Sequence, residues 1–426
     1  MGTKGMLAGT SAAAVAGLLF LLGPGGGLPG GGLPGATAGT ARHAPMAEHV
    51  RLDSTVASLG GALSRTAAGF AVPSPGVSSG LQAVACTSAS NCWAVGSYQT
   101  KTAQLNEALR WDGGGWITVA TPDHGTGRDD HSSLSAVACT SASNCWAVGS
   151  YDTGAGQRNQ ALHWNGGGWT RIATPDPGLA GSGTRALNGV SCVSRNDCWA
   201  VGTHISDRGI SRNAVLRWNG AAWSAVSAPN PGANVAGDSR ELSGVTCASA
   251  GDCWAVGGYL STTGADRNET LHWNGTRWLR VAARGNGALM SVACTSAASC
   301  WAVQGQTSRK SAIRWNGTSW SAAATPGDAE LSGVACAGAA SCMAVGNRTS
   351  SGALLNSVLR WDGTGWSAVT VPDPGGSGAG AQNRLAAVAC TSAANCWAVG
   401  SYWDSSAVAH RNTALRWNGH AWSSQH

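Results

Sequence analysis

The sequence predicts an all-β fold, a seven-bladed β-propeller of four-stranded antiparallel blades with one disulfide in each blade. Three observations lead to this prediction. A C-W-A-V-G motif with a second cysteine six residues upstream recurs every 42 to 55 residues, and self-similarity at such a period marks a repeat architecture. Each unit holds four short apolar runs between turn residues, without a helical period. All tryptophans except Trp403 sit at three repeat positions.

The first unit illustrates the four strands that we expect in each blade. They cover residues 81–86, 92–96, 106–111 and 116–121. In the second strand Trp93 and Val95 point to one side, and Cys92 and Ala94 point to the other, so both faces of the sheet are specified. Sheets that are apolar on both faces can bury them only against one another, and a ring of blades achieves this.

In this order of elements the unit resembles the Kelch repeat, whose second strand ends in glycine and whose fourth strand opens with tryptophan. The N-G-x-x-W turn, for instance at 165–169, is similar to the Asp-box turn of sialidase-like propellers. The resemblance covers about residues 68–426 and implies a propeller architecture, with no catalytic residue to carry over. The chain departs from the Kelch pattern in its single glycine after the second strand and in its cysteine pairs.

All fourteen cysteines belong to the repeat. They form seven pairs of identical spacing: Cys86/Cys92, Cys139/Cys145, Cys192/Cys198, Cys247/Cys253, Cys294/Cys300, Cys336/Cys342 and Cys390/Cys396. A hairpin brings two β-carbons at this spacing within disulfide reach. A metal site would need two further ligands per pair, and the histidines do not follow the cysteines. We therefore expect intra-blade disulfides that form in an oxidising compartment and pin the inner hairpins, with no metal and no cofactor.

The N-terminal residues differ in composition from the repeats. Lys4 is followed by an uncharged stretch rich in Ala and Leu, which is typical of a secretory signal, and an uncleaved single-span anchor is the alternative. We predict that residues 1–38 are a signal peptide or anchor with a Gly/Pro-rich linker. Residues 39–66 are predicted to be flexible or weakly helical, and 67–426 to form the propeller.

The ring is expected to close through residues 68–76, AGFAVPSPG. This stretch aligns with the ends of the outer strands at 170–178, 224–232 and 367–375. The seventh unit reaches only His426, four residues beyond Trp422, before its own outer strand is complete. We expect the N-terminal stretch to supply that strand, which leaves no blade edge open.

Charged residues are sparse, at 11% of the chain with a net charge of +6, and they form no basic patch of the kind that nucleic-acid binders carry. One basic residue per blade precedes the third-strand tryptophan: Arg110, His163, Arg217, His272, Arg314, Arg360 and Arg416. We interpret these as structural side chains that stack on tryptophan or pair with turn carboxylates. We expect a monomer with no nucleic-acid partner, and membrane contact only through an uncleaved anchor.

Loop lengths separate two faces of the predicted propeller. The turns at one end are short and uniform, whereas the loops at the other end are long and variable, and function usually lies on such loops. All four tyrosines occupy one position where the second strand reaches the long loops. This ring and an adjacent tryptophan are the candidate ligand-binding residues: Tyr98, Tyr151, His204, Tyr259, Gln306, Arg348, Tyr402 and Trp403. Either each ring residue caps a seam between blades, or the ring stacks on a glycan or peptide.

Two further patterns mark the long-loop face. Asparagine recurs at the start of the third strand, which we interpret as backbone capping, and arginine precedes it in four units: Arg158, Arg212, Arg267 and Arg411. Unit five has the shortest connections, at 283–287 and 304–310. We expect a notch there, lined by Tyr259, Gln306 and Arg348.

Signals of catalysis are few. The chain has no nucleophile elbow, although loop carboxylates such as Asp152 and Asp404 could flank a glycosidic bond. The sequence therefore favours a secreted or cell-surface, non-catalytic binding module that recognises extracellular polysaccharide or protein. A secreted glycan-active hydrolase or lyase and a structural surface protein are the alternatives.

Overall fold

The computed structural model describes residues 72–425 except 126, 129, 153, 155, 177–183, 206–208, 233–238, 284 and 306–311. The predicted leader and linker, residues 39–66 and Gln306 lie outside the described residues. The strands are β1 (Ser78–Ser88), β2 (Asn91–Gln99), β3 (Gln104–Trp111), β4 (Trp116–Thr118), β5 (His131–Ser141), β6 (Asn144–Asp152), β7 (Gln157–Trp164), β8 (Trp169–Ile172), β9 (Arg185–Ser194), β10 (Asp197–Ile205), β11 (Ser211–Trp218), β12 (Trp223–Ala225), β13 (Arg240–Ser249), β14 (Asp252–Leu260), β15 (Asp266–Trp273), β16 (Trp278–Arg280), β17 (Leu289–Ser296), β18 (Ser299–Gln304), β19 (Ala312–Trp315), β20 (Trp320–Ala323), β21 (Glu330–Gly338), β22 (Ser341–Ser350), β23 (Ala353–Trp361), β24 (Trp366–Val369), β25 (Asn383–Ser392), β26 (Asn395–Asp404), β27 (Ala409–Trp417) and β28 (Trp422–Ser424). In this part of the chain no helix is long and apolar enough to cross a bilayer.

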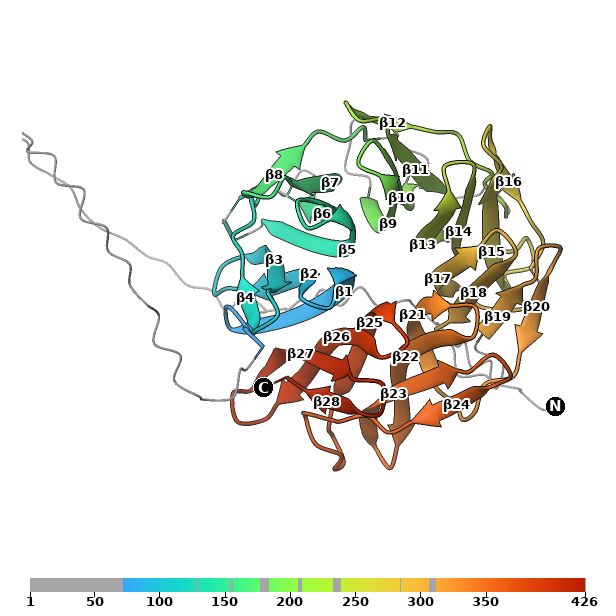
Figure 1. Ribbon diagram of the computed structural model, residues 1–426. Coiled ribbons are helices and arrows are strands. Elements are labelled where there is room, and N and C mark those ends of the chain that lie inside the picture. Colours follow the sequence, from blue (N-terminus) through green and yellow to red (C-terminus); the bar gives the residue numbers. More distant parts are fainter. Residues whose placement is uncertain are drawn as a thin grey trace, which may run out of the picture. The chain divides into compact units, whose positions relative to one another are not determined.

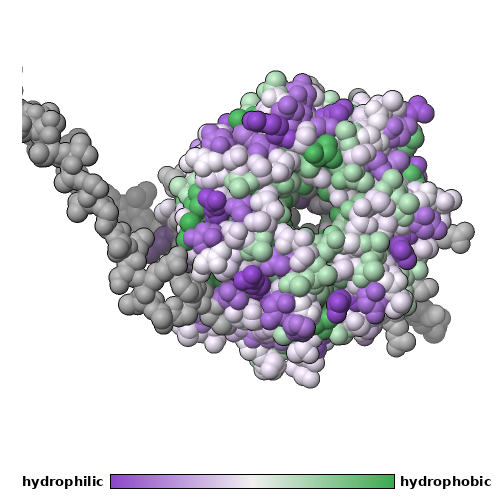
Figure 2. All heavy atoms as spheres, viewed as in Figure 1, coloured by the Kyte–Doolittle hydropathy of each residue, from purple (hydrophilic) through white to green (hydrophobic). Residues whose placement is uncertain are grey.

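The strands pair in fours, and each antiparallel sheet is one blade of a ring (Figure 1). We number the blades 1 to 7 in chain order, and in each the first strand lies nearest the axis. A single parallel bridge between Gln104 and His131 joins the first two sheets. Innermost strands of successive blades contact one another around the ring, including β1 with β25. The predicted seven-bladed propeller is confirmed, and Figure 2 shows its central opening.

A β-bulge in the innermost strand explains the glycine of the C-W-A-V-G motif. In blade 1 the register of β1 against β2 shifts between Leu81 and Ala83. A β-carbon on Gly96 would lie 2.1 Å from the carbonyl oxygen of Gly80, so the position requires glycine. Blade 5 has Gln304 there instead and keeps the bulge, between Leu289 and Ser291. Its first strand begins only at Leu289, so the strand residue whose carbonyl approaches the glycine in blade 1 has no counterpart in β17.

Tryptophans from two neighbouring blades fill each seam of the ring. Trp93 of blade 1 is fully buried and packs against Trp164 and Trp169 of blade 2, with ring centroids 4.7 and 4.9 Å away. The same triad recurs at five other seams. At the remaining seam Met343 takes the place of the second-strand tryptophan. Each indole removes about 150 to 250 Å² from water, so these triads form the core of the ring.

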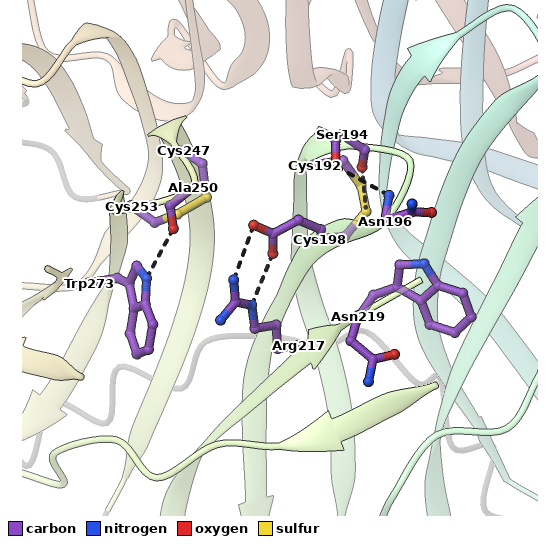
Figure 3. A network of polar contacts seen from close by, with 12 residues as sticks. Cys192, Ser194, Asn196, Cys198, Arg217, Asn219, Cys247, Ala250, Cys253 and Trp273 are labelled. Carbon is purple, nitrogen blue, oxygen red and sulfur yellow. Dashed lines mark hydrogen bonds and ion pairs between the residues drawn. A yellow bond between two sulfur atoms is a disulfide. The ribbon is translucent and has the colours of Figure 1, made fainter. Parts of the chain in front are cut away.

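The third-strand tryptophans and their basic neighbours have the structural role that we predicted. The indole N–H of Trp273 donates to the carbonyl of Ala250 in the first turn of its blade (Figure 3), and every blade has the equivalent bond. The Arg217 guanidinium lies 5.1 Å from the Trp199 ring and pairs with Asp197 at 3.0 Å. Arginine or histidine stacks in this way in the six blades whose second strand carries tryptophan.

All seven predicted disulfides are present, and no cysteine is free. In each blade the two cysteines lie directly opposite one another across the first hairpin. The bonds are Cys86–Cys92, Cys139–Cys145, Cys192–Cys198, Cys247–Cys253, Cys294–Cys300, Cys336–Cys342 and Cys390–Cys396. Seven such bonds are typical of a protein that folds in an oxidising environment.

The second-strand cysteines have a role beyond the predicted one of pinning the inner hairpins. The first cysteine of each pair is half-buried, whereas the second is at most 1% exposed and belongs to the apolar core of the seam with the preceding blade. These core residues are Cys92, Cys145, Cys198, Cys253, Cys300, Cys342 and Cys396. Cys145, for instance, lies in one cluster with Trp93.

The physical reason is the alternation of side chains along the second strand. Its tryptophan faces the following blade, so the cysteine before it faces the preceding one. A buried sulfur packs as a small apolar group, and no ligand can reach it. The second-strand cysteines therefore belong to the packing between blades, and they form no part of a binding surface.

The third-strand asparagines hold the outer strand of their own blade, as the capping interpretation predicts. In blade 1 the side chain of Asn106 donates to the carbonyl of Pro122 at 3.2 Å, and its backbone N–H donates to the Asp123 carboxylate at 2.7 Å. Equivalent bonds occur in blades 2, 3 and 6. In these four blades the hydrogen bonds fix the point at which the chain leaves the outer strand for the next blade.

Two chain segments share the outer edge of blade 7. The C-terminal segment forms β28, and the N–H of Gln425 donates to the carbonyl of Ala414. Beyond that point the N-terminal residues continue the edge, with Val72 buried in the seam with blade 1. Asn412 donates from its side chain to the Pro73 carbonyl and from its backbone to the Ser74 hydroxyl, at 2.7 and 2.9 Å.

The predicted closure of the ring is therefore confirmed, with one refinement. The outer strand itself is β28, and the N-terminal stretch adds its continuation from Val72 onward. The alignment of residues 68–76 with 224–232 places Phe70 at the position of Val226, and in blade 7 Gln425 holds this position instead. Phe70 lies outside the described residues.

We predict that deletion of residues 1–76 destabilises the propeller more than deletion of residues 1–71. The longer deletion removes the buried Val72 side chain and both acceptors of Asn412. Burial of a valine and two hydrogen bonds together correspond to about 3 kcal/mol. Urea unfolding of the two proteins measures the difference, and equal midpoints would contradict the assigned closure.

Candidate functional site

The described ring residues sit at the long-loop end of the second strand, each on its own blade. They do not converge on one point, because each side chain points toward the preceding blade. Tyr151, for instance, shares a sheet face with Ala147, which packs in the seam with blade 1. Among the described ring residues Arg348 is exposed, and the others are half-buried.

Two of the tyrosines are engaged by other side chains of the protein. The Tyr151 ring stacks on His124 of the preceding blade, with centroids 3.2 Å apart and planes 4° from parallel. Burial and the nearby Arg171 lower the pKa of His124 to about 4, so this imidazole is neutral near pH 7. The Tyr259 hydroxyl accepts a hydrogen bond from Arg280, whose guanidinium lies 5.0 Å from the ring. The Tyr151 contact crosses a seam and supports the seam-capping interpretation for that residue, whereas the Tyr259 contact lies within blade 4.

A groove of about 340 Å³ lies on the long-loop face of blade 7, where the two ends of the propeller meet. We call it the closure groove. Its lining residues are Val72, Pro73, Ser74, Tyr402, Asp404, Arg411, Asn412, Thr413, Ser424 and Gln425. Of the residues predicted from sequence to bind ligand, it contains Tyr402.

The closure groove combines an aromatic ring, a cation and an anion. Tyr402 and Arg411 are direct cross-strand partners of β26 and β27, so both reach the same face. The Arg411 Nε atom lies 3.9 Å from Asp404 Oδ2. Asp404 Oδ1 accepts bonds from the hydroxyl and N–H of Ser406, and these bonds lower the pKa of Asp404. The carboxylate is therefore held in place and ionised.

Trp403 lies on the opposite face of β26 from Tyr402. Its ring contacts His410, its cross-strand partner, at 5.1 Å in an edge-on arrangement. The two candidates that stand side by side in the sequence thus face different blades. Trp403 remains a candidate ligand contact, outside the lining of the groove.

The notch predicted at blade 5 stays a prediction, because β18 ends at Gln304, β19 begins at Ala312, and residues 306–311 between them lie outside the described residues. Arg348 shares a face with Ala344, which packs in the seam with blade 5, so Arg348 does point toward the predicted notch. Tyr259 shares a face with Ala255, which packs against blade 3, and therefore does not line it. The loop that carries Gln306 lies outside the described residues.

Two carboxyls with strongly raised pKa lie buried in the seams; neither lines the closure groove, although Glu107 accepts a hydrogen bond from Asn412, which does. Glu107 and Glu269 are 1% and 0% exposed, and burial raises the pKa of each to about 8. One oxygen of each accepts from an asparagine of the preceding blade, Asn412 and Asn213 respectively, and the other has no partner among the described residues.

Blade 2 shows why these carboxyls stay protonated. It carries Gln160 at the same position, and the Gln160 amide N–H₂ group donates to the carbonyls of Ser133 and Ser150. A carboxylate oxygen at that place would face backbone carbonyls, whereas a carboxylic acid can donate to one of them. A strongly shifted carboxyl often marks an active site, but these two are closed to any substrate and serve packing.

The geometry defines the class of this protein, a seven-bladed β-propeller. No family model and no curated protein matches the chain. The GH74 xyloglucanase from Xanthomonas campestris is similar over 81% of this chain and 59% of its own length, with 13% identity and a TM-score of 0.51. YCF48 from Cyanidioschyzon merolae (82% of this chain, 99% of its own, 16% identity) and U3-55K (77%, 90%, 12%) have TM-scores of 0.48 and 0.49. These likenesses concern the fold alone, and the resemblance to Kelch and Asp-box repeats stays a prediction.

We predict that the double substitution Glu107→Gln, Glu269→Gln stabilises the protein at alkaline pH and changes little at pH 5. A folded-state pKa of about 8, above the ordinary 4.5, means that the native state holds these protons more tightly. The stability that they contribute is complete below pH 4.5 and declines as pH rises toward about 8. A glutamine amide keeps the hydrogen bonds but has no titratable proton to lose. We therefore expect the free energy of unfolding to increase by roughly 2 kcal/mol per site at pH 9.

Thermal unfolding between pH 5 and pH 9 measures this effect. Glu330→Gln is the control, because Glu330 is only half-buried, at the end of a strand. A wild type and a double variant with the same pH dependence would refute the protonated state of the two seam residues.

Proposed function

We propose that the protein is a non-catalytic binding module of an oxidising extracellular compartment and that its ligand docks in the closure groove. The observation that carries this proposal is the groove itself, which places the Tyr402 ring, the Arg411 guanidinium and the Asp404 carboxylate around one concavity. Concave sites with an aromatic surface and a few fixed polar groups are where ligands usually bind. The ligand classes that we propose are extracellular polysaccharide and extracellular protein.

The chemistry of the groove favours binding over hydrolysis. A glycosidase needs two carboxyl groups on either side of the scissile bond, one of them protonated to act as the acid. Among the described lining residues Asp404 is the one carboxylate, and its pKa is lowered. A propeller can also carry an enzyme, as the GH74 xyloglucanase does, so the fold does not decide this question.

Two observations support the proposed location, the disulfides and the N-terminal sequence. Seven disulfides fit an oxidising compartment, and the stretch after Lys4 provides a secretion signal or an anchor. We propose secretion or display at the cell surface. A purely structural role would leave the closure groove without a ligand.

We predict that Tyr402→Ala weakens ligand binding at least about tenfold, because stacking side chains at the centre of a site carry much of its affinity. The experiment applies the exported full-length protein to an array of extracellular glycans, cell-wall fragments and secreted proteins. The affinity for each bound member is then compared between wild type and variant.

Tyr259→Ala is the matched control, because Tyr259 occupies the same repeat position but is engaged by Arg280. Trp403→Ala tests the opposite face of the same strand. Binding that is unchanged in Tyr402→Ala and lost in Trp403→Ala would move the site to that face. Turnover of any array member would contradict the binding proposal and favour the alternative function, a glycan-active hydrolase or lyase.

A further inference from the structure

Blade 4 contains a filled counterpart of the closure groove. Tyr259 and Arg267 are cross-strand partners there, as Tyr402 and Arg411 are in blade 7. Leu271 pairs with Arg280 in blade 4, and Leu415 pairs with Ser424 in blade 7. Arg280 and Ser424 are therefore equivalent residues, two positions after the tryptophan that opens the fourth strand.

These equivalent residues do different things. The Arg280 side chain lies over the Tyr259 ring and donates to its hydroxyl. Ser424 is too short to reach Tyr402 in this way, and it lines the open groove instead. In blade 2 the equivalent residue is Arg171, which donates to the carbonyl of Asp123 beside the stacked His124 and Tyr151. The space next to the tyrosine is thus filled by the protein's own side chains in blades 2 and 4.

Blade 7 adds a carboxylate that blade 4 lacks. The strand register puts Asp404 two residues beyond Tyr402, where blade 4 has Ser261. The bonds from Ser406 and Ala407 all reach Asp404 Oδ1. Among the described residues Oδ2 has only the long 3.9 Å approach of Arg411, so it has room for a further donor.

We propose that the closure groove recognises an arginine side chain of a partner protein. This inference rests on the proposed function and specifies its ligand. The partner's guanidinium lies above the Tyr402 ring, as the Arg280 guanidinium lies above the Tyr259 ring. The Tyr402 hydroxyl accepts a hydrogen bond from it, and Asp404 Oδ2 provides the counter-charge. Arg411 is no obstacle, because Arg267 and Arg280 coexist beside Tyr259 in blade 4.

The chemistry favours arginine over lysine and over a neutral sugar. A planar guanidinium can stack on the tyrosine while it donates to the carboxylate, whereas an ammonium is a strongly hydrated point charge. A neutral sugar would stack on Tyr402 but would leave the Asp404 carboxylate with Arg411 alone as its counter-charge, at 3.9 Å.

The probe is the tripeptide acetyl-Gly-Arg-Gly-amide, and isothermal titration measures its affinity for the exported protein. The comparison peptides carry citrulline, the neutral isostere of arginine, or lysine. We expect the arginine peptide to bind at least about fivefold more tightly than either one, and Tyr402→Ala and Asp404→Asn each to remove that preference.

Substitution of Ser424 by arginine provides an independent test. Ser424→Arg should fill the groove with a side chain of the protein itself and lower the affinity for the arginine peptide at least about tenfold. Ala368→Arg is the matched control, because it adds the same charge at the equivalent position of blade 6, where Arg348 stands in place of the tyrosine. We expect it to bind the peptide like the wild type.

Equal binding of the arginine and citrulline peptides, or full binding by Ser424→Arg, would overturn the arginine assignment. A glycan from the array that binds through Tyr402 would also overturn it, while the proposed function would stand. If array ligands bind but neither Tyr402→Ala nor Asp404→Asn weakens them, the closure groove is not the site and the proposed function fails.

Discussion

Packing of tryptophan across the seams between blades is the interaction on which the rest of the structure depends. A blade of four short strands cannot bury its faces alone, and this chain has only two phenylalanines to help. Each second-strand indole inserts between two indoles of the next blade, so every blade is stable only next to its neighbours. The disulfide, the glycine opposite the bulge and the basic residue over the indoles all hold that hairpin in the position that the seam requires.

The seams also have a polar layer on their long-loop side. Third-strand asparagines bind the outer strand of their own blade and, in several seams, a buried Glu or Gln of the next blade. Buried polar groups are costly unless they are bonded, so this layer tolerates only one register between blades. Asn412 belongs to it and also holds the N-terminal segment, which makes closure of the ring part of the same network.

The regular features could be predicted from the sequence, and the irregular ones could not. Repeats reveal blades, disulfides and the stacking of Arg217, because each residue type recurs beside the same partner. The pairing of Tyr402 with Arg411 was missed, although both lie in recurring patterns, because only the strand register shows that they are neighbours. Arg280 gave little signal, since its position is Thr, Ala or Ser in every other blade except blade 2, where it is Arg171. The protonation of Glu107 depends on carbonyls from another strand, which no local motif reports.

Ligand recognition on such a scaffold has to come from departures from the repeat. In blades 2 and 4 the protein's own side chains fill the space beside the ring tyrosine. Blade 7 departs from the repeat at its edge, which passes from Gln425 to the N-terminal residues. Ser424, as small as its equivalents in most blades, leaves the space beside Tyr402 open there. Asp404 adds a charge at the same place. A concave site with a free aromatic ring therefore forms at the closure of the ring, where one blade is assembled from two segments and its outer edge is least constrained by the repeat.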